Sequence, residues 1–444
     1  MNSLLPYLVV DLCLVISLSL LLVKRLSFWH PATVYLVFHF YSFTWRAIGL
    51  VNGAPPMYAQ NPAADMIMAP EYERALLWAD VGLVAFCIAA YWAHLRFEPQ
   101  SHRPIVRRTL SPRLVVAVCC VALPIGILAL YAAKSDVYVS DVVATSGYFQ
   151  TLTMWPFGCL AMLVFAYGFR WYSVILICAY LAVVALQGYH RFMVLFPLIF
   201  FSAYFLQSRR RLWPTLPIIL LGFVTAMIFP RLKYIGQAYQ NGDTAEAINL
   251  VFESFVERKS YEAVSYGEDF FDQYAGGLTM TDEAGKFYFG STYLAIVTLP
   301  VPRAIWPDKP GLADHVHDIS TTRRQYNVEG RILTYLGEAY LNFGYLGMVA
   351  IPALLGFFLT GWCLRATSGP LRRFDRYLYV VFFIAFIQLY RDGILSLLVF
   401  TVVHNIPMAV VWFLHLIPGL APKVLDLPPA DPRAQVDGAI TVLR

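Results

Sequence analysis

Residues 4–23 read LLPYLVVDLCLVISLSLLLV, an apolar run in which Asp11 is the single charged side chain. A helix of this length rises about 30 Å, which is the thickness of the hydrocarbon core of a bilayer. The run lacks the basic n-region and the small-residue cleavage site of a secretory signal peptide. We therefore expect a transmembrane helix that is retained.

The composition of the whole chain extends this expectation. Of the 444 residues, 59% are hydrophobic and 14% are charged, and the mean hydropathy is +0.59. These values exclude an ordinary soluble globule and indicate a polytopic membrane protein. The net charge of +5 is explained by basic residues on cytoplasmic loops, so no nucleic-acid partner is expected.

Ten further apolar windows are candidates for crossing the bilayer. They lie at 31–51, 74–95, 114–133, 151–169, 172–188, 192–207, 212–230, 343–364, 377–390 and 394–417. With the first run they predict an all-α, polytopic helical bundle of about 11 transmembrane helices. Helices 1–8 fall in residues 1–230 and helices 9–11 in 343–420, with a polar segment at 231–342 and a tail at 421–444.

Basic residues predict the orientation. The loops on one side hold fifteen Lys and Arg residues, from Lys24 to Arg376, whereas the short loops on the other side hold very few. The positive-inside rule places the first set in the cytoplasm, so the N-terminus is outside and the tail inside. Segment 231–342 then forms one large external segment, with fifteen acidic and ten basic residues. Within it, 244–274 has helical periodicity, and 292–299 is apolar but too short to span.

Neither a disulfide framework, a metal site nor a cofactor is expected. All seven cysteines fall in apolar stretches and none has the spacing of metal ligands. Asp11 and His39 are ionisable residues inside predicted spans, where such groups are uncommon. Either they line a cavity or they hydrogen bond from helix to helix.

A proline-rich segment lies near the end of the external part. Residues 299–310 read LPVPRAIWPDKP, and the four prolines force extended or turn backbone. The segment carries Arg303, Asp308 and Lys309, and Trp306 between them is a ring of the kind that settles at headgroup level. A guanidinium and an ammonium held near a bilayer suit phosphate binding. The alternative is an interfacial loop whose charges only stay in water.

Three further arginines are placed on the same outer side by this topology. Arg46 lies near the outer end of the second span, Arg191 at the outer turn after the sixth, and Arg391 at the outer turn between the last two. With Arg303 and Lys309 they predict an electropositive pocket for a lipid-linked phosphate or pyrophosphate. For each single arginine, snorkelling or a local ion pair is the alternative.

Four short motifs resemble one protein family. Residues 302–310, PRAIWPDKP, resemble the Pro-Arg, Trp-Pro, Lys-Pro pattern of bacterial oligosaccharide repeat-unit polymerases, the Wzy-like O-antigen and exopolysaccharide polymerases. Residues 337–347, GEAYLNFGYLG, are similar to the family's Gly-Glu, Asn-Phe-Gly, Gly pattern. GYHR at 188–191 is similar to its Gly-x-x-Arg turn, and GSTY at 290–293 to its Gly-x-x-Tyr.

The resemblance implies a glycosyltransferase of the GT-C type, inverting and metal-independent, in the bacterial inner membrane with its active site facing the periplasm. Its partners would be undecaprenyl-pyrophosphate-linked oligosaccharides as donor and acceptor, membrane lipids and a chain-length regulator protein. Negative charge grows on the departing pyrophosphate, and preorganised guanidinium groups stabilise such charge well. We therefore assign Arg191, Arg303 and Arg391 to the pyrophosphate, with Lys309 and Arg46 as helpers.

The base for the acceptor hydroxyl has several candidates. Glu338 lies beside the apolar run that opens span nine, where burial would favour a useful base; a helix-start role is the alternative. His315 and His317 are alternative bases, and their His-x-His spacing lacks a third metal ligand. Asp308 would orient Lys309 or Arg303.

Two other functions stay open at this point. An O-antigen ligase, or another lipid-linked sugar transferase, shares a large external loop with arginines, but the segment 299–310 favours the polymerase. A lipid-linked oligosaccharide flippase or transporter would be expected to show internal repeats and charges distributed through the midplane. This chain shows no such repeat, and its charges gather on one side.

Overall fold

The computed structural model describes residues 2–54, 69–97, 107–108, 111–132, 152–186, 192–209, 211–228, 231–256, 269–298, 301, 306, 333–367, 374–398, 401, 405–417, 420 and 423–424. Its α-helices are α1 (Leu5–Leu22), α2 (Pro31–His39), α3 (Trp45–Val51), α4 (Ala69–Phe97), α5 (Pro112–Ala132), α7 (Trp155–Tyr167), α8 (Trp171–Leu186), α9 (Phe192–Ser208), α10 (Leu216–Ile228), α11 (Leu232–Gln240), α12 (Thr244–Val256), α13 (Asp269–Ala284), α14 (Ser291–Thr298), α16 (Thr334–Thr367), α17 (Phe374–Ile384), α18 (Phe386–Asp392), α19 (Ile394–Leu398) and α20 (Ile406–Leu416). A 3₁₀ turn, η1 (Asn2–Leu4), precedes α1, and a π-helix, η2 (Phe40–Thr44), joins α2 to α3. The two-residue strands β1 (Arg107–Arg108) and β2 (Lys423–Val424) pair antiparallel.

The predicted all-α class is confirmed. Within the described residues, five helical stretches are long and apolar enough to cross a membrane: Leu5–Leu22, Pro31–Val51, Pro70–Phe97, Pro112–Tyr131 and Thr334–Thr367. Five shorter apolar helices of 10–17 residues accompany them, namely α7, α8, most of α9, α10 and α20. The number of eleven spans and the external position of 231–342 stay predictions.

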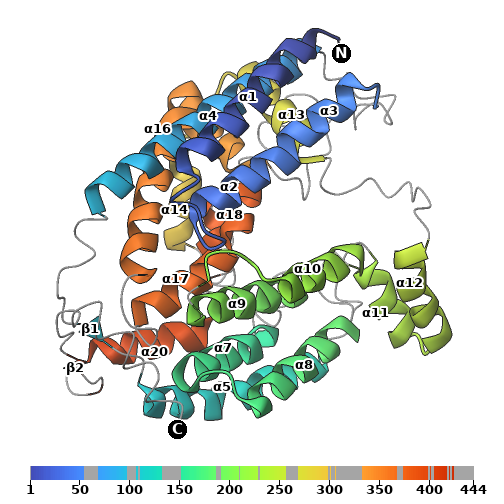
Figure 1. Ribbon diagram of the computed structural model, residues 1–444, viewed down its shortest axis with the longest axis vertical. Coiled ribbons are helices and arrows are strands. Elements are labelled where there is room, and N and C mark those ends of the chain that lie inside the picture. Colours follow the sequence, from blue (N-terminus) through green and yellow to red (C-terminus); the bar gives the residue numbers. More distant parts are fainter. Residues whose placement is uncertain are drawn as a thin grey trace.

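The helices form two groups (Figure 1). Helices α1, α2, α3, α4 and α16 lie together in one group, in which α4 packs along α16 and α1. Helices α5, α7, α8, α9 and α10 form the other, with α5 against α7 and α8 against α9. Between them run α17, which contacts α9, and α18, which contacts α2.

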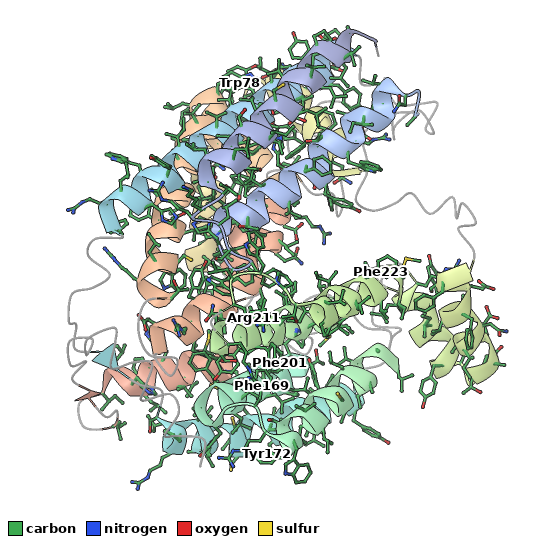
Figure 2. All side chains as sticks on the ribbon, viewed as in Figure 1. Trp78, Phe169, Tyr172, Phe201, Arg211 and Phe223 are labelled. Atoms are coloured by element: carbon green, nitrogen blue, oxygen red, sulfur yellow. The ribbon has the colours of Figure 1, made fainter. Side chains whose placement is uncertain are left out.

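The surface of α10 supports a hydrocarbon environment. This helix has no buried residue, and its one polar side chain, Thr225, donates its hydroxyl to the backbone carbonyl of Leu221. Phe223, labelled on α10 in Figure 2, is 61% exposed. A helix that is apolar all round and uncovered is expected to face lipid, because water would penalise that surface.

Aromatic side chains fill the core of both groups (Figure 2). In the first group the Tyr35 ring lies 4.7 Å from Phe86 and 4.8 Å from Tyr390, centroid to centroid. The Tyr390 hydroxyl donates to the backbone carbonyl of Pro31 at 3.1 Å, which ties α18 to the start of α2. In the second group Phe169 lies edge-on to Phe201 at 6.1 Å.

Helix α16 changes direction at Gly344. That residue has φ +61° and ψ −149°, a backbone conformation that only glycine adopts readily. Past the bend, a Cβ on Gly347 would lie 2.2 Å from the carbonyl oxygen of Ala339, so the two arms of α16 touch through glycine. The sequence places the start of span nine at 343, and the bend at Gly344 is where the first arm of α16, residues 334–343, meets that span.

Candidate functional site

Four of the candidate residues from the sequence lie in the described part of the chain: Arg46, Trp306, Glu338 and Arg391. The other six lie outside the described residues: Arg191, Arg303, Asp308, Lys309, His315 and His317. Glu338 and Arg391 come from helices far apart in sequence, α16 and α18, and these two helices pack together.

Glu338 is a buried carboxyl that is only half satisfied. Glu338 lies in the first arm of α16 and is 1% exposed. Its Oε2 atom accepts a hydrogen bond of 2.9 Å from the backbone N–H of Ile394, the first residue of α19. Its Oε1 atom has no hydrogen-bond partner among the described residues. One oxygen is therefore held in place while the other retains its capacity to accept a proton.

Gly393 makes this contact possible. It sits between α18 and α19 with φ +98°, in the left-handed region that favours glycine. A Cβ at this position would lie 2.2 Å from Oε2 of Glu338. The absence of a side chain at 393 thus lets the carboxyl approach the backbone.

Arg391 stands two residues before this glycine. Its guanidinium forms an ion pair with Asp392 at 3.2 Å and lies over the Phe270 ring, 5.3 Å from the centroid. Burial raises the pKa of Asp392 to about 6, and the Arg391 charge opposes this shift. The segment that contacts Glu338 therefore carries a guanidinium beside a carboxyl whose charged form is disfavoured by burial.

Asn342 joins two of the sequence motifs. Its Nδ2 donates to the Glu338 carbonyl oxygen at 2.8 Å and to the Thr292 hydroxyl at 2.6 Å. Its Oδ1 accepts from the backbone N–H of Gly290 at 2.9 Å. The motif at 290–293 is thus fixed against the motif at 337–347.

Tyr293 completes the described site. Its hydroxyl is buried and has no hydrogen-bond partner among the described residues, and its ring stacks on Phe343 at 6.2 Å. Burial, and secondarily the charge of Glu338, raise the pKa of the Tyr293 hydroxyl. The hydroxyl therefore stays protonated at neutral pH and is able to donate a hydrogen bond.

Arg46 has a partner of its own. Its Nη2 and Nε atoms donate to Oδ2 of Asp272 at 2.8 and 3.2 Å, and the Tyr72 hydroxyl donates to Oδ1 of the same carboxylate at 2.6 Å. This buried pair ties α3 to α13 and α4, which is the local ion pair that the sequence left open as an alternative. Its role as a pyrophosphate helper stays a prediction.

Trp306 is 44% exposed. Its interfacial position stays a prediction.

The sequence singles out Glu338 and Arg391 as candidates, and their roles stay predictions; it does not indicate the groups that contact them. Nothing in the sequence indicates a role for Gly393, which follows Arg391 and Asp392. Its role becomes visible only in the structure, where Glu338 lies against it. Asn342 and Tyr293 were visible inside their motifs, without assigned roles. Comparison with protein-family models, with curated proteins and with solved structures finds no match to this chain.

Proposed function

We propose that this chain polymerises undecaprenyl-pyrophosphate-linked oligosaccharide repeat units by inverting glycosyl transfer. One observation carries the proposal: the segments at 290–293 and 391–394 both hydrogen bond to the segment at 337–347, the first through Asn342 and the second through the buried carboxyl of Glu338. Two of these segments are the motifs that resemble the repeat-unit polymerases, and the third supplies an arginine.

In the proposed reaction Glu338 accepts a proton, and the arginines stabilise the charge of the leaving group. A hydroxyl of the acceptor sugar attacks the anomeric carbon of the donor, and Oε1 of Glu338 takes its proton. The bond from that carbon to the pyrophosphate oxygen breaks, and the pyrophosphate leaves with the bonding electrons. Arg391 is the described group placed to stabilise that charge, and Arg191 and Arg303 are its proposed partners, with Lys309 as a helper.

Burial favours this division of roles. A carboxyl that is closed off from water is a better base than an exposed one, because desolvation disfavours its charged form. Tyr293 would donate a hydrogen bond to a sugar or phosphate oxygen from its stacked position on Phe343. The single hydrogen bond from Ile394 orients the carboxyl without using the oxygen that the reaction needs.

The proposed topology puts this site on the periplasmic face of a bacterial inner membrane. Eleven spans with the N-terminus outside would leave 231–342 external. The last two predicted spans, 377–390 and 394–417, correspond to the short helices α17 to α20. Broken helices are tolerated at membrane depth where they are buried in protein or line a cavity. The break between α18 and α19 occurs at Gly393, next to Glu338.

The test is reconstitution. Purified protein in nanodiscs would receive lipid-linked oligosaccharide, and the products would be separated as a ladder while released polyprenyl pyrophosphate is measured. We expect a ladder that Arg303→Ala and Glu338→Gln abolish and that Glu253→Gln does not. Glu253 is the matched carboxylate, in α12 and paired with Arg231. Addition of one unit to a foreign acceptor such as lipid A core would replace the proposal with a ligase. No covalent product from authentic substrates would replace it with a transporter.

A further inference from the structure

A second group of buried ionisable side chains lies away from Glu338, between α1, α2 and α4. The Nε2 atom of His39 is 2.8 Å from Oδ1 of Asp11 and 3.4 Å from Oδ1 of Asp80. Asp11 and His39 are fully buried and Asp80 is nearly so. The contact of Asp11 with His39 is the helix-to-helix hydrogen bond that the sequence left open. Asp80, which the sequence analysis did not single out, is the third member.

This cluster has more polar atoms than partners. Among the described residues, Oδ2 of Asp11, Nδ1 of His39 and Oδ1 of Asp80 make no hydrogen bond. The hydroxyl of Thr44 is also fully buried and has no hydrogen-bond partner among the described residues. It lies close to the carboxyl of Asp11. Thr44 reaches this position because the π-helix η2 inserts an extra residue into the turn after His39.

Two acidic side chains and one basic side chain meet in the cluster. If both carboxylates are ionised, a positive ion is needed to balance them; a proton retained by one carboxyl beside an imidazolium balances them as well. Within the described part of the chain, no Lys or Arg side chain forms an ion pair with Asp11 or Asp80, and Arg46 is engaged by Asp272. Uncompensated charge inside a membrane helix bundle is costly, so the cluster holds either a retained proton or a bound cation. The geometry of its ligand atoms is what favours the cation.

The ligand atoms match one class of cation. Carboxylate oxygens with an imidazole nitrogen suit zinc and its neighbours among the first-row transition metals, whereas calcium and magnesium take oxygen ligands. The three ligand atoms, one from each side chain, lie within 4.8 Å of one another. Ligand atoms about 2.0–2.2 Å from a tetrahedral zinc are roughly 3.3 Å apart, so small side-chain shifts would suffice.

We propose that Asp11, His39 and Asp80 bind a divalent transition-metal ion such as Zn²⁺, with the Thr44 hydroxyl beside it. The ion joins α1, α2 and α4 and takes the place of the proton shared by His39 and Asp11, which is released to solvent. Its role is structural, and the inference goes beyond the proposed polymerase because no step of glycosyl transfer depends on it.

The experiment uses the full-length protein in detergent. After treatment with EDTA and removal of the chelator, the protein is titrated with Co²⁺ and with Zn²⁺. Visible absorption reports the Co²⁺ site, elemental mass spectrometry the stoichiometry and thermal unfolding the stabilisation. We expect stoichiometric uptake with proton release and a raised Tm. In Asp80→Asn and His39→Gln we expect affinity weaker by more than about a hundredfold.

Matched controls separate this site from other buried groups. His94→Gln changes another buried histidine, which contacts His30 at 3.0 Å, and Glu338→Gln changes another buried carboxyl; both variants should take up metal as the wild type does. Thr44→Val keeps the shape and should weaken uptake less than Asp80→Asn does. If Asp80→Asn does not fold, the wild-type titration and His39→Gln still decide. Absence of stoichiometric uptake by the wild type, or full uptake by Asp80→Asn and His39→Gln, overturns the proposal. A Tm that follows pH and ignores both metals would identify a cluster that holds protons instead.

Discussion

At the scale of single residues, Glu338 is the test of the chemistry. Glu338→Gln keeps the shape and the contact with the Ile394 N–H but removes the basic oxygen. We expect elongation to fall by about 10²- to 10⁴-fold, the usual size of a general-base effect. Binding of lipid-linked substrate should stay close to that of the wild type, because the amide replaces the carboxylate without loss of volume. The measurement pairs the rate of ladder formation with binding to the same nanodiscs.

Normal elongation by Glu338→Gln would contradict this role. The base would then be His315, His317 or a group of the acceptor itself. Loss of both binding and elongation would instead indicate that the carboxyl positions substrate.

Arg391 gives a prediction for pH. The pKa of Asp392 is about 6 because the carboxyl is buried, so the group is largely neutral below that pH and ionised above it. As pH falls through 6, the carboxylate that competes with phosphate for the Arg391 guanidinium loses its charge. Affinity for lipid-linked pyrophosphate should therefore rise as pH falls, on the order of fivefold, the size of a partly exposed ion pair. The Asp392→Asn variant should bind with the same affinity above and below pH 6. If this variant instead shows the same rise in affinity at low pH as the wild type, the prediction is wrong.

At this scale, the sequence predicts a residue's role when the evidence lies in its neighbours along the chain, and fails when its partners lie on other helices. Glu338 was visible because it stands beside an apolar run, and its burial follows from that position. Asp80 was not singled out, although it lies inside the predicted span 74–95 and carries the same signal as Asp11. No local pattern, however, assigns a partner to either residue. Its partners Asp11 and His39 are on two other helices, and only the packing of α1, α2 and α4 brings the three together.

At the scale of elements, the junction of α18 and α19 can be tested with a pair of glycines. Gly393→Ala places a Cβ against Oε2 of Glu338 and in a left-handed conformation. Gly168, which ends α7 with φ +81°, has nothing within 4 Å of its Cβ position. Both substitutions cost about 1–3 kcal/mol of backbone strain, but only Gly393→Ala displaces the carboxyl. We expect elongation to fall at least about tenfold in Gly393→Ala and to stay near wild type in Gly168→Ala, with a similar loss of Tm in both.

Equal activity of the two glycine variants would show that Glu338 does not need its contact with Ile394.

Long helices were predicted well from sequence, because the length of an apolar run can be measured without knowing the tertiary structure: 74–95 lies within α4, and 114–133 nearly coincides with α5. The windows 377–390 and 394–417 instead contain α17 to α20. Hydropathy averages over a window, whereas the breaks at Ala385 and Gly393 are single-residue backbone events.

At the scale of the whole molecule, the prediction concerns which side of the membrane each segment faces. The proposed topology puts Trp306 outside and Arg211 in the cytoplasm, and both side chains are exposed. In intact spheroplasts, a charged maleimide that does not cross membranes should label Trp306→Cys, and should label Arg211→Cys only after permeabilisation. The native cysteines provide the background: four are buried, and Cys13, Cys120 and Cys178 lie exposed on the apolar helices α1, α5 and α8, where a charged reagent reacts poorly in lipid. Labelling of both variants from the same side would remove the external position of the proline-rich segment. That result would also contradict the predicted position of Arg303 and Lys309 at the outer leaflet. It would leave the contacts around Glu338 unchanged.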